Sequence, residues 1–290
     1  MKHSIKSLLC AVCALSLLAF GGCAKEESAP APEKAPAAET KAEDNSKSET
    51  TVIKVGASPA PHAEILEACK EVLKEKGYDL QIEEFTEWAL LNPSLDSGEL
   101  DANYFQHIPY LEDYCANRDG HLSPLVKVHF EPLGLYKGKS DSLESIKEGA
   151  EIGVPNDSTN EARALQLLEA QGIIKLKEDA GLHTTVNDIV ENPHNVKIVE
   201  MIAAQLPRAL QDLDFAVING NYALESDILD SLLLTEDAQS EAAQEFANVI
   251  AVQEGHEDDP AIKALAEAIT SDEVKEFIEA TYNNTVVPVF

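Results

Sequence analysis

The sequence predicts an α/β fold built from two lobes. Segments with strand-like apolar runs alternate with segments of helical spacing between residues 51 and 115. The same alternation starts again at residue 151, and the chain after residue 259 returns to helical spacing. Strand–helix–strand units with short connections form right-handed crossovers and mostly parallel sheets. Two such blocks predict two lobes with a ligand cleft between them, beyond the carboxyl ends of the strands.

The first lobe is predicted at residues 51–136, the second at 137–247, and the chain returns to the first at 248–290. It therefore crosses between the lobes twice, near 136–139 and near 246–252, and these crossings are the expected hinge. The expected strands lie at 52–55, 80–85, 152–155, 196–200, 215–219 and 246–252. The expected helices lie at 61–77, 88–98, 111–115, 140–147, 158–170 and 205–210, and two more begin at Pro260 and Asp272.

Two stretches carry local signals beyond periodicity. Ser158 and Glu161 have the spacing of a capping box, which predicts that a helix begins at Ser158. The stretch 98–111 gathers polar and aromatic side chains at the end of an apolar segment. That density favours a pocket wall over a core, and we expect Phe105 and His107 to face a small-molecule ligand.

The amino-terminal residues 1–22 have the pattern of an export signal. A positively charged start precedes the apolar run Leu8–Phe20, which is too short to span a bilayer. Small residues directly before Cys23 resemble the lipobox of bacterial lipoproteins, in which that Cys is acylated; an ordinary signal peptide is the alternative. Residues 23–50 would then be the lipidated Cys and a disordered tether that lacks large apolar residues. We expect a protein of the bacterial cell envelope, lipid-anchored to a membrane at its periplasmic or cell-surface face.

The formal net charge of −30 argues against nucleic acid and anionic membrane surfaces as direct partners, because both would repel the chain. Of the five cysteines, Cys10 and Cys13 belong to the export signal. Cys69 and Cys115 remain, and the sequence leaves open whether they form a disulfide or two buried thiols.

Motifs for catalysis, cofactors and metals give little support to an enzyme. The chain has no Gly-x-Ser-x-Gly elbow and no Gly-x-Gly-x-x-Gly loop, and Gly138-Lys-Ser lacks the earlier glycine of a phosphate loop because Leu133 stands there. The eight histidines are dispersed without His-x-x-x-His spacing. We therefore expect a binding protein with no cofactor and no metal site.

Five segments resemble, in order along the chain, the MetQ/NlpA family of methionine-binding lipoproteins of ABC importers. They are Gly98–His107, Val154–Arg163, Val190–Pro193, Gln205–Arg208 and Ala216–Asn219. The resemblance implies a two-lobed periplasmic-binding-protein fold of type II-like topology, with methionine held in the cleft. It also implies delivery of the ligand to a membrane permease that works with an ATPase.

The family's ligand contacts fall on seven residues of this chain: Trp88, Phe105, His107, Asn160, Arg163, Asn219 and Asn248. Their chemistry suits an amino acid. Arg163 would bind the carboxylate, and the amides of Asn219 and Asn248 would accept from the ammonium. Trp88 and Phe105 would contact the thioether, because sulfur packs well against aromatic rings. Without the resemblance, a solvated helix charge is the typical role of a residue placed like Arg163.

Several alternatives stay open. Trp88 stands where the family often has Tyr, and Tyr104 replaces a small residue and is expected at the pocket rim. Both could shift the ligand from L- or D-methionine to a methionine-containing dipeptide or another apolar amino acid. An envelope lipoprotein with a surface role, such as adhesion, is a further alternative, since Ala24 leaves sorting between the two membranes open.

Overall fold

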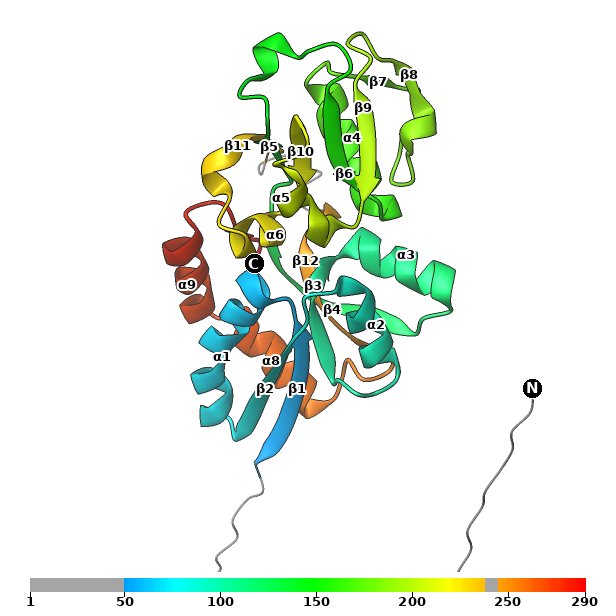
Figure 1. Cartoon of the computed structure of the whole chain (residues 1–290). Helices are drawn as coiled ribbons and strands as arrows, with labels where there is room; N and C mark the ends of the chain where they lie inside the picture. The colour runs from blue at the N-terminus through cyan, green and yellow to red at the C-terminus, as the bar shows by residue number, and fades with distance from the viewer. Residues whose placement is uncertain (1–49, 238–244) are drawn as a thin grey trace, which may run out of the picture. The chain divides into compact units, whose positions relative to one another are not determined.

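A computed structural model describes residues 50–237 and 245–290, all within one compact unit, Ser48–Phe290. The predicted export signal, Cys23 and the tether up to residue 49 lie outside the described residues. Within the described part, no helix is long and apolar enough to cross a membrane. Two mixed sheets with helices on their faces, together with a small two-stranded sheet, make up the described part of the unit (Figure 1).

The first sheet has six strands in the order β13-β4-β12-β3-β1-β2. Its strands are β1 Thr51–Ala57, β2 Tyr78–Glu84, β3 Ala102–His107, β4 Leu122–Phe130, β12 Asn248–Gln253 and β13 Val287–Pro288. β1 is parallel to β2 and β3, whereas β12 runs antiparallel between β3 and β4. The insertion of β12 beside β3 brings the late part of the chain next to the predicted pocket wall.

Helices cover both faces of the first sheet. α1 (Glu64–Glu75), α8 (Pro260–Ile269) and α9 (Asp272–Tyr282) bury their apolar sides on one face. α2 (Trp88–Asp96) and α3 (Ile108–Arg118) pack on the other. Successive strand residues point to opposite faces, so Tyr104 joins the α1 side of the core and Phe105 joins the α2 side. Tyr104 is fully buried, and the expectation that it lies at the pocket rim is wrong.

The second sheet has five strands in the order β11-β5-β10-β6-β9. They are β5 Gly134–Lys137, β6 Glu151–Pro155, β9 Lys197–Met201, β10 Phe215–Ile218 and β11 Leu232–Thr235. α4 (Ser158–Ala170) packs on one face, and α5 (Leu206–Ala209) and α6 (Gly220–Glu225) pack on the other. The remaining short elements are β7 Lys175–Leu176, β8 Ile189–Glu191, a π-helical turn Pro59–Ala63, and 3-10 turns at Leu143–Ser145, Val186–Asp188, Ala203–Gln205 and Leu229–Ser231.

The chain passes from the first sheet to the second earlier than predicted. β4 ends at Phe130 and β5 begins at Gly134 as a strand of the second sheet, so the crossing lies at residues 131–133. The predicted boundary at residue 136 falls inside β5, because periodicity does not say which sheet a short apolar strand will join. The return crossing lies between β11 and β12, partly outside the described residues. That the two sheets move as lobes about these crossings remains a proposal.

Local helix signals were mostly sufficient to place the helices. The last helix begins where predicted, with the Ser271 hydroxyl accepting from the backbone N–H of Val274. α4 begins at Ser158 as predicted, but its cap differs from the predicted capping box, because the carboxylate of Asp157 accepts from the backbone N–H of Asn160. The predicted linking helix at 140–147 is only the 3-10 turn Leu143–Ser145. Cys69 and Cys115 are two free thiols.

Candidate ligand-binding site

One buried pocket collects residues from both sheets. Six of the seven predicted contacts line it: Trp88, Phe105, His107, Arg163, Asn219 and Asn248. The seventh, Asn160, lines a smaller adjoining space with Phe105 and His107. The pocket has a volume of about 20 Å³, which is room for roughly one water molecule. An amino acid can enter only after the surrounding groups move apart.

Trp88 and Phe105 form the aromatic end of the pocket, and the rings of Tyr110 and Tyr222 pack against them. Trp88, the first residue of α2, stacks on Tyr222 of α6 with ring centroids 4.6 Å apart and planes 29° apart. The rings of Phe105 and Tyr110 lie 6.5 and 6.1 Å from Trp88. The indole Nε1–H of Trp88 is buried and has no hydrogen-bond partner among the described residues. This end therefore offers flat apolar surface and one unsatisfied donor.

Asn160 connects the two sheets at the floor of the site. Its Oδ1 accepts from His107 Nε2 at 3.1 Å and from Asn219 Nδ2 at 2.9 Å. Its Nδ2 donates to Asp157 at 2.8 Å. His107 caps α3 through Nδ1, which accepts from the backbone N–H of Tyr110. Asn160 is fully buried with these partners, so in this conformation it positions His107 and Asn219.

Arg163 is buried on α4, but one edge of its guanidinium is already paired. Nε and Nη2 donate to the two carboxylate oxygens of Glu236 at 2.7 and 2.5 Å, and Nη2 also donates to the backbone oxygen of Glu131 at 2.8 Å. The guanidinium lies over the ring of Phe246, 4.6 Å from its centroid. The sequence analysis predicts that the Arg163 guanidinium is free to bind a ligand carboxylate. In this conformation its Nε and Nη2 donors are bound to Glu236 instead.

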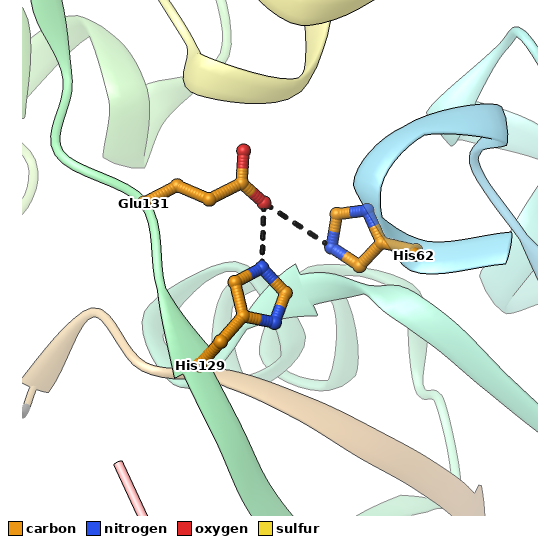
Figure 2. A group of neighbouring side chains, drawn as sticks. All are labelled: His62, His129 and Glu131. Atoms are coloured by element: carbon orange, nitrogen blue, oxygen red, sulfur yellow. Dashed lines mark hydrogen bonds and ion pairs between the residues drawn. The ribbon is translucent and has the colours of Figure 1, made fainter. Parts of the chain in front are cut away.

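A buried cluster of His62, His129 and Glu131 lies beside the pocket (Figure 2). Both rings turn Nε2 toward the same Glu131 oxygen, His129 at 2.8 Å and His62 at 3.4 Å. Their other ring nitrogens accept from the hydroxyls of Ser58, at 2.7 Å from His62, and Tyr104. His62 Nε2 also lies 3.0 Å from Asn248 Oδ1. These residue types are metal ligands elsewhere, but here each ring nitrogen already has a protein hydrogen-bond partner.

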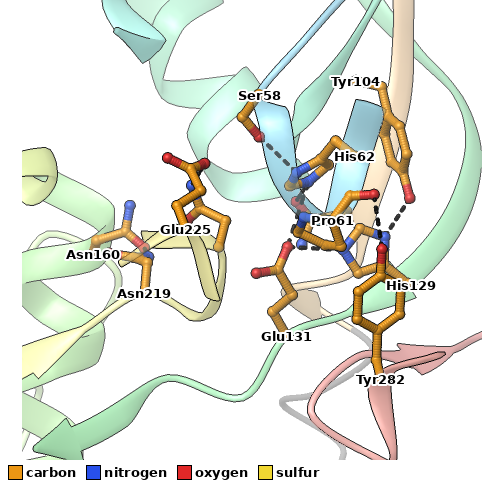
Figure 3. A network of polar contacts seen from close by, with 12 residues as sticks. Ser58, Pro61, His62, Tyr104, His129, Glu131, Asn160, Asn219, Glu225 and Tyr282 are labelled. Atoms are coloured by element: carbon orange, nitrogen blue, oxygen red, sulfur yellow. Dashed lines mark hydrogen bonds and ion pairs between the residues drawn. The ribbon is translucent and has the colours of Figure 1, made fainter. Parts of the chain in front are cut away.

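The second carboxylate oxygen of Glu131 points away from both rings (Figure 2). Glu131 itself lines the pocket and belongs to the crossing between β4 and β5. Figure 3 shows it between the two histidines on one side and Asn160 and Asn219 on the other. We call Glu131, Arg163 and Asn219 the polar end of the pocket.

Burial controls the ionisation of this region. It lowers the pKa of His62 to about 4 and the pKa of His129 to about 3. It also lowers the pKa of His107 to about 3, and the positive charge of Arg163 lowers it further. Burial also raises the pKa of Glu131, and the neighbouring His62, the charge of Arg163 and a hydrogen bond from the backbone N–H of Asn221 oppose this rise. The three imidazoles are therefore neutral at pH 7, and with Nδ1 accepting, each carries its proton on Nε2.

Glu131, His62, His129 and Glu236 were missed by the sequence analysis. One signal was available, because His129 and Glu131 are two residues apart, which places them on one side of an extended chain. The chain has 52 acidic residues, most of which are expected at the solvent-exposed surface, so the sequence did not distinguish Glu131 from them. No spacing rule connects residue 62 to residue 131 or residue 163 to residue 236, because these contacts exist only after the sheets pack.

Known proteins resemble this chain over most of its length. A family model described as NlpA lipoprotein matches residues 53–290. The D-methionine-binding lipoprotein MetQ of Salmonella typhimurium is 39% identical over 240 residues, which covers 81% of this chain and 87% of the relative.

Two solved structures share the fold. A nutrient binding protein from Burkholderia cenocepacia bound to methionine has a TM-score of 0.78 at 42% identity, over 82% of this chain and 100% of that one. An ABC transporter periplasmic substrate-binding protein from Coxiella burnetii has a TM-score of 0.76 at 38% identity, over 82% and 100%. The predicted periplasmic-binding-protein fold is confirmed, and this chain belongs to the NlpA lipoprotein family.

Proposed function

We propose that this protein is the substrate-binding lipoprotein of an ABC importer, which captures methionine in the pocket between the two sheets and delivers it to a membrane permease. The observation that carries the proposal is the convergence of six predicted contacts from distant segments on one buried pocket. The names of the relatives, a D-methionine-binding lipoprotein and a methionine-bound nutrient binding protein, support the same ligand.

The two ends of the pocket match the two parts of the ligand. The aromatic end offers Trp88 and Phe105 to a thioether, and sulfur–aromatic contacts contribute about 0.3–1.5 kcal/mol each. The polar end offers Arg163 to a carboxylate and the amide oxygen of Asn219 to an ammonium. The role is binding, and no step of it requires chemical change of the ligand.

Ligand entry requires an opening motion, because the pocket has a volume of only about 20 Å³ in this conformation. The crossings between the sheets, at residues 131–133 and between β11 and β12, are the places where the sheets would hinge. Closure around the ligand would present the closed form to the permease and its ATPase.

Attachment to the envelope would come from acyl chains on Cys23, each buried methylene contributing about 0.8 kcal/mol. The tether 24–50 could reach about 90 Å when fully extended, at roughly 3.3 Å per residue. Such a reach would let the binding unit approach a permease in the same membrane. Replacing Cys23 by Ser should move the protein from the membrane fraction to the soluble fraction of the envelope.

Calorimetry tests the ligand assignment. The purified protein is unfolded and refolded to remove carried-over ligand, and then titrated with L-methionine, D-methionine and Gly-Met. Saturable heat with either methionine enantiomer, and weaker heat with the dipeptide, is the expected result. Tighter binding of Gly-Met would favour a dipeptide binder, and no heat with any of the three would refute the proposal.

A further inference from the structure

The hydroxyl of Ser158 makes its hydrogen bond outside the helix that it begins. The carboxylate of Asp157 caps α4, whereas Ser158 Oγ donates to Asp113 Oδ1 at 2.8 Å. Glu161, the other member of the predicted capping box, accepts from the backbone N–H of Val186 at 3.1 Å. A side chain with the sequence pattern of a helix start is therefore used for a long-range contact instead of a local one.

The contact between Asp113 and Ser158 joins the two sheets. Asp113 lies on α3, which packs on the first sheet, and Ser158 lies on α4, which packs on the second (Figure 1). His107 immediately precedes α3, Arg163 lies on α4, and both side chains line the ligand pocket. The separation of these two helices therefore affects how far the pocket is open.

Asp113 and Ser158 lie outside the ligand pocket. They line an open surface groove of about 820 Å³, which shares no lining residue with the pocket among the described residues. The Asp113 side chain is 26% exposed, and its carboxylate accepts at the first turn of α4, where the helix dipole attracts negative charge. His183 Nδ1 lies 3.7 Å from the same oxygen, but its ring is 73% exposed, so solvent screens that contact. Substitutions at this contact leave the pocket lining unchanged.

Ligand exchange must break this contact. The pocket has a volume of only about 20 Å³ in this conformation, so the sheets have to part before a ligand enters or leaves. Asp113 and Ser158 stand on different sheets, so their hydrogen bond exists in the closed form and is lost as the sheets separate. A contact present only in the closed form favours that form and slows its opening, while ligand entry into the open form is unaffected.

We propose that Asp113 and Ser158 form a clasp outside the ligand pocket, which holds the two sheets closed and sets the rate of ligand release. Both are positioning residues, because they act on the ligand only through α3 and α4. The inference rests on the proposed function and adds to it a control of how long the ligand is held.

The variant Ser158→Ala tests the clasp, since it removes the donor while Asp157 still caps α4. Refolded wild type and variant are loaded with radiolabelled methionine and chased with excess unlabelled methionine to measure the release rate. Release should be about fivefold faster in the variant, because a partly exposed hydrogen bond to a carboxylate contributes less than a fully buried one. The association rate should stay within about twofold of the wild type.

The conservative variant Ser158→Thr keeps the hydroxyl and should release methionine at the wild-type rate. An unchanged release rate in Ser158→Ala, or an effect confined to the association rate, would overturn the clasp.

A double-mutant cycle shows whether the two residues act through one contact. Asp113→Ala removes the acceptor and should speed release by about the same factor as Ser158→Ala, and the double variant should be no faster than either single variant. Glu112→Ala is the matched control, because Glu112 is the next residue on α3, is exposed, lines the same groove and carries the same charge. It should release methionine at the wild-type rate. Multiplied effects in the double variant, or equally fast release in Glu112→Ala, would contradict the clasp.

The outcomes separate this inference from the proposed function. A wild type that binds methionine, with a release rate that neither Ser158→Ala nor Asp113→Ala changes, would leave the importer role intact and remove only the clasp. A wild type that binds no methionine would remove both. If Ser158→Ala fails to fold, as judged by thermal unfolding, Asp113→Ala and its control Glu112→Ala decide the question.

Discussion

The aromatic end of the pocket is held by ring contacts, whereas its polar end is held by charge pairs and hydrogen bonds. Trp88 stacks on Tyr222 and lies near Phe105 and Tyr110, contacts that tolerate small shifts in position. Arg163 depends on the exact placement of Glu236, and Glu131 depends on two oriented imidazoles. We infer that the polar end determines selectivity for the amino and carboxylate groups of an amino acid. The aromatic end determines how well a given ligand side chain fits.

The largest effect should follow Arg163→Ala, at the polar end. The variant removes the proposed carboxylate contact and leaves Glu236 without its partner. We expect methionine affinity to fall by about 1–3 kcal/mol or more and the free energy of unfolding to fall by about 3 kcal/mol. Calorimetry and urea unfolding measure the two. The control is Arg208→Ala, at an exposed position, which should change neither the affinity nor the free energy of unfolding. Wild-type affinity in Arg163→Ala would show that Arg163 does not contact the ligand carboxylate.

The second prediction concerns His107, which lies between the two ends. Its folded-state pKa of about 3 is below the unfolded value of 6.5, so the unfolded chain binds more protons between these values. The stabilisation is present above pH 6.5 and is lost as pH falls. At pH 5 the wild type should have lost about 2 kcal/mol from this group, and His107→Gln should lose none from it.

Urea unfolding at pH 7.5 and pH 5.0 checks this. The destabilisation caused by His107→Gln should be smaller at pH 5.0 than at pH 7.5, by about 2 kcal/mol. The variant His121→Gln, at an exposed position, should show no such difference between the two pH values. An equal effect of His107→Gln at both pH values would contradict the buried, neutral imidazole.

The smallest effect should follow Trp88→Phe, at the aromatic end. The ring stack on Tyr222 shrinks but an aromatic face remains, so methionine affinity should fall by only about 0.5–1.5 kcal/mol. Calorimetry with methionine and norleucine measures whether the sulfur preference changes. A loss as large as that of Arg163→Ala would erase the proposed contrast between the ends.

The sequence by itself determined most of the local structure and one side of the site. Apolar spacing placed most strands and helices, and the last two helices begin at Pro260 and Asp272 as predicted. The family resemblance named seven residues that the fold brings together. These predictions succeed because helix starts and strand alternation depend on residues that are neighbours in the chain. The family motifs identify individual site positions without any knowledge of the fold.

Only the tertiary structure decided how those residues are paired. It placed β5 in the second sheet, moved Tyr104 into the core, gave Glu236 to Arg163 and set two histidines against Glu131. The physical reason is that the ionisation and the pairing of a buried group depend on the groups packed around it. Those groups come from segments far apart in the chain, and no sequence periodicity connects them. The ionisation and the charge balance of the pocket follow from packing.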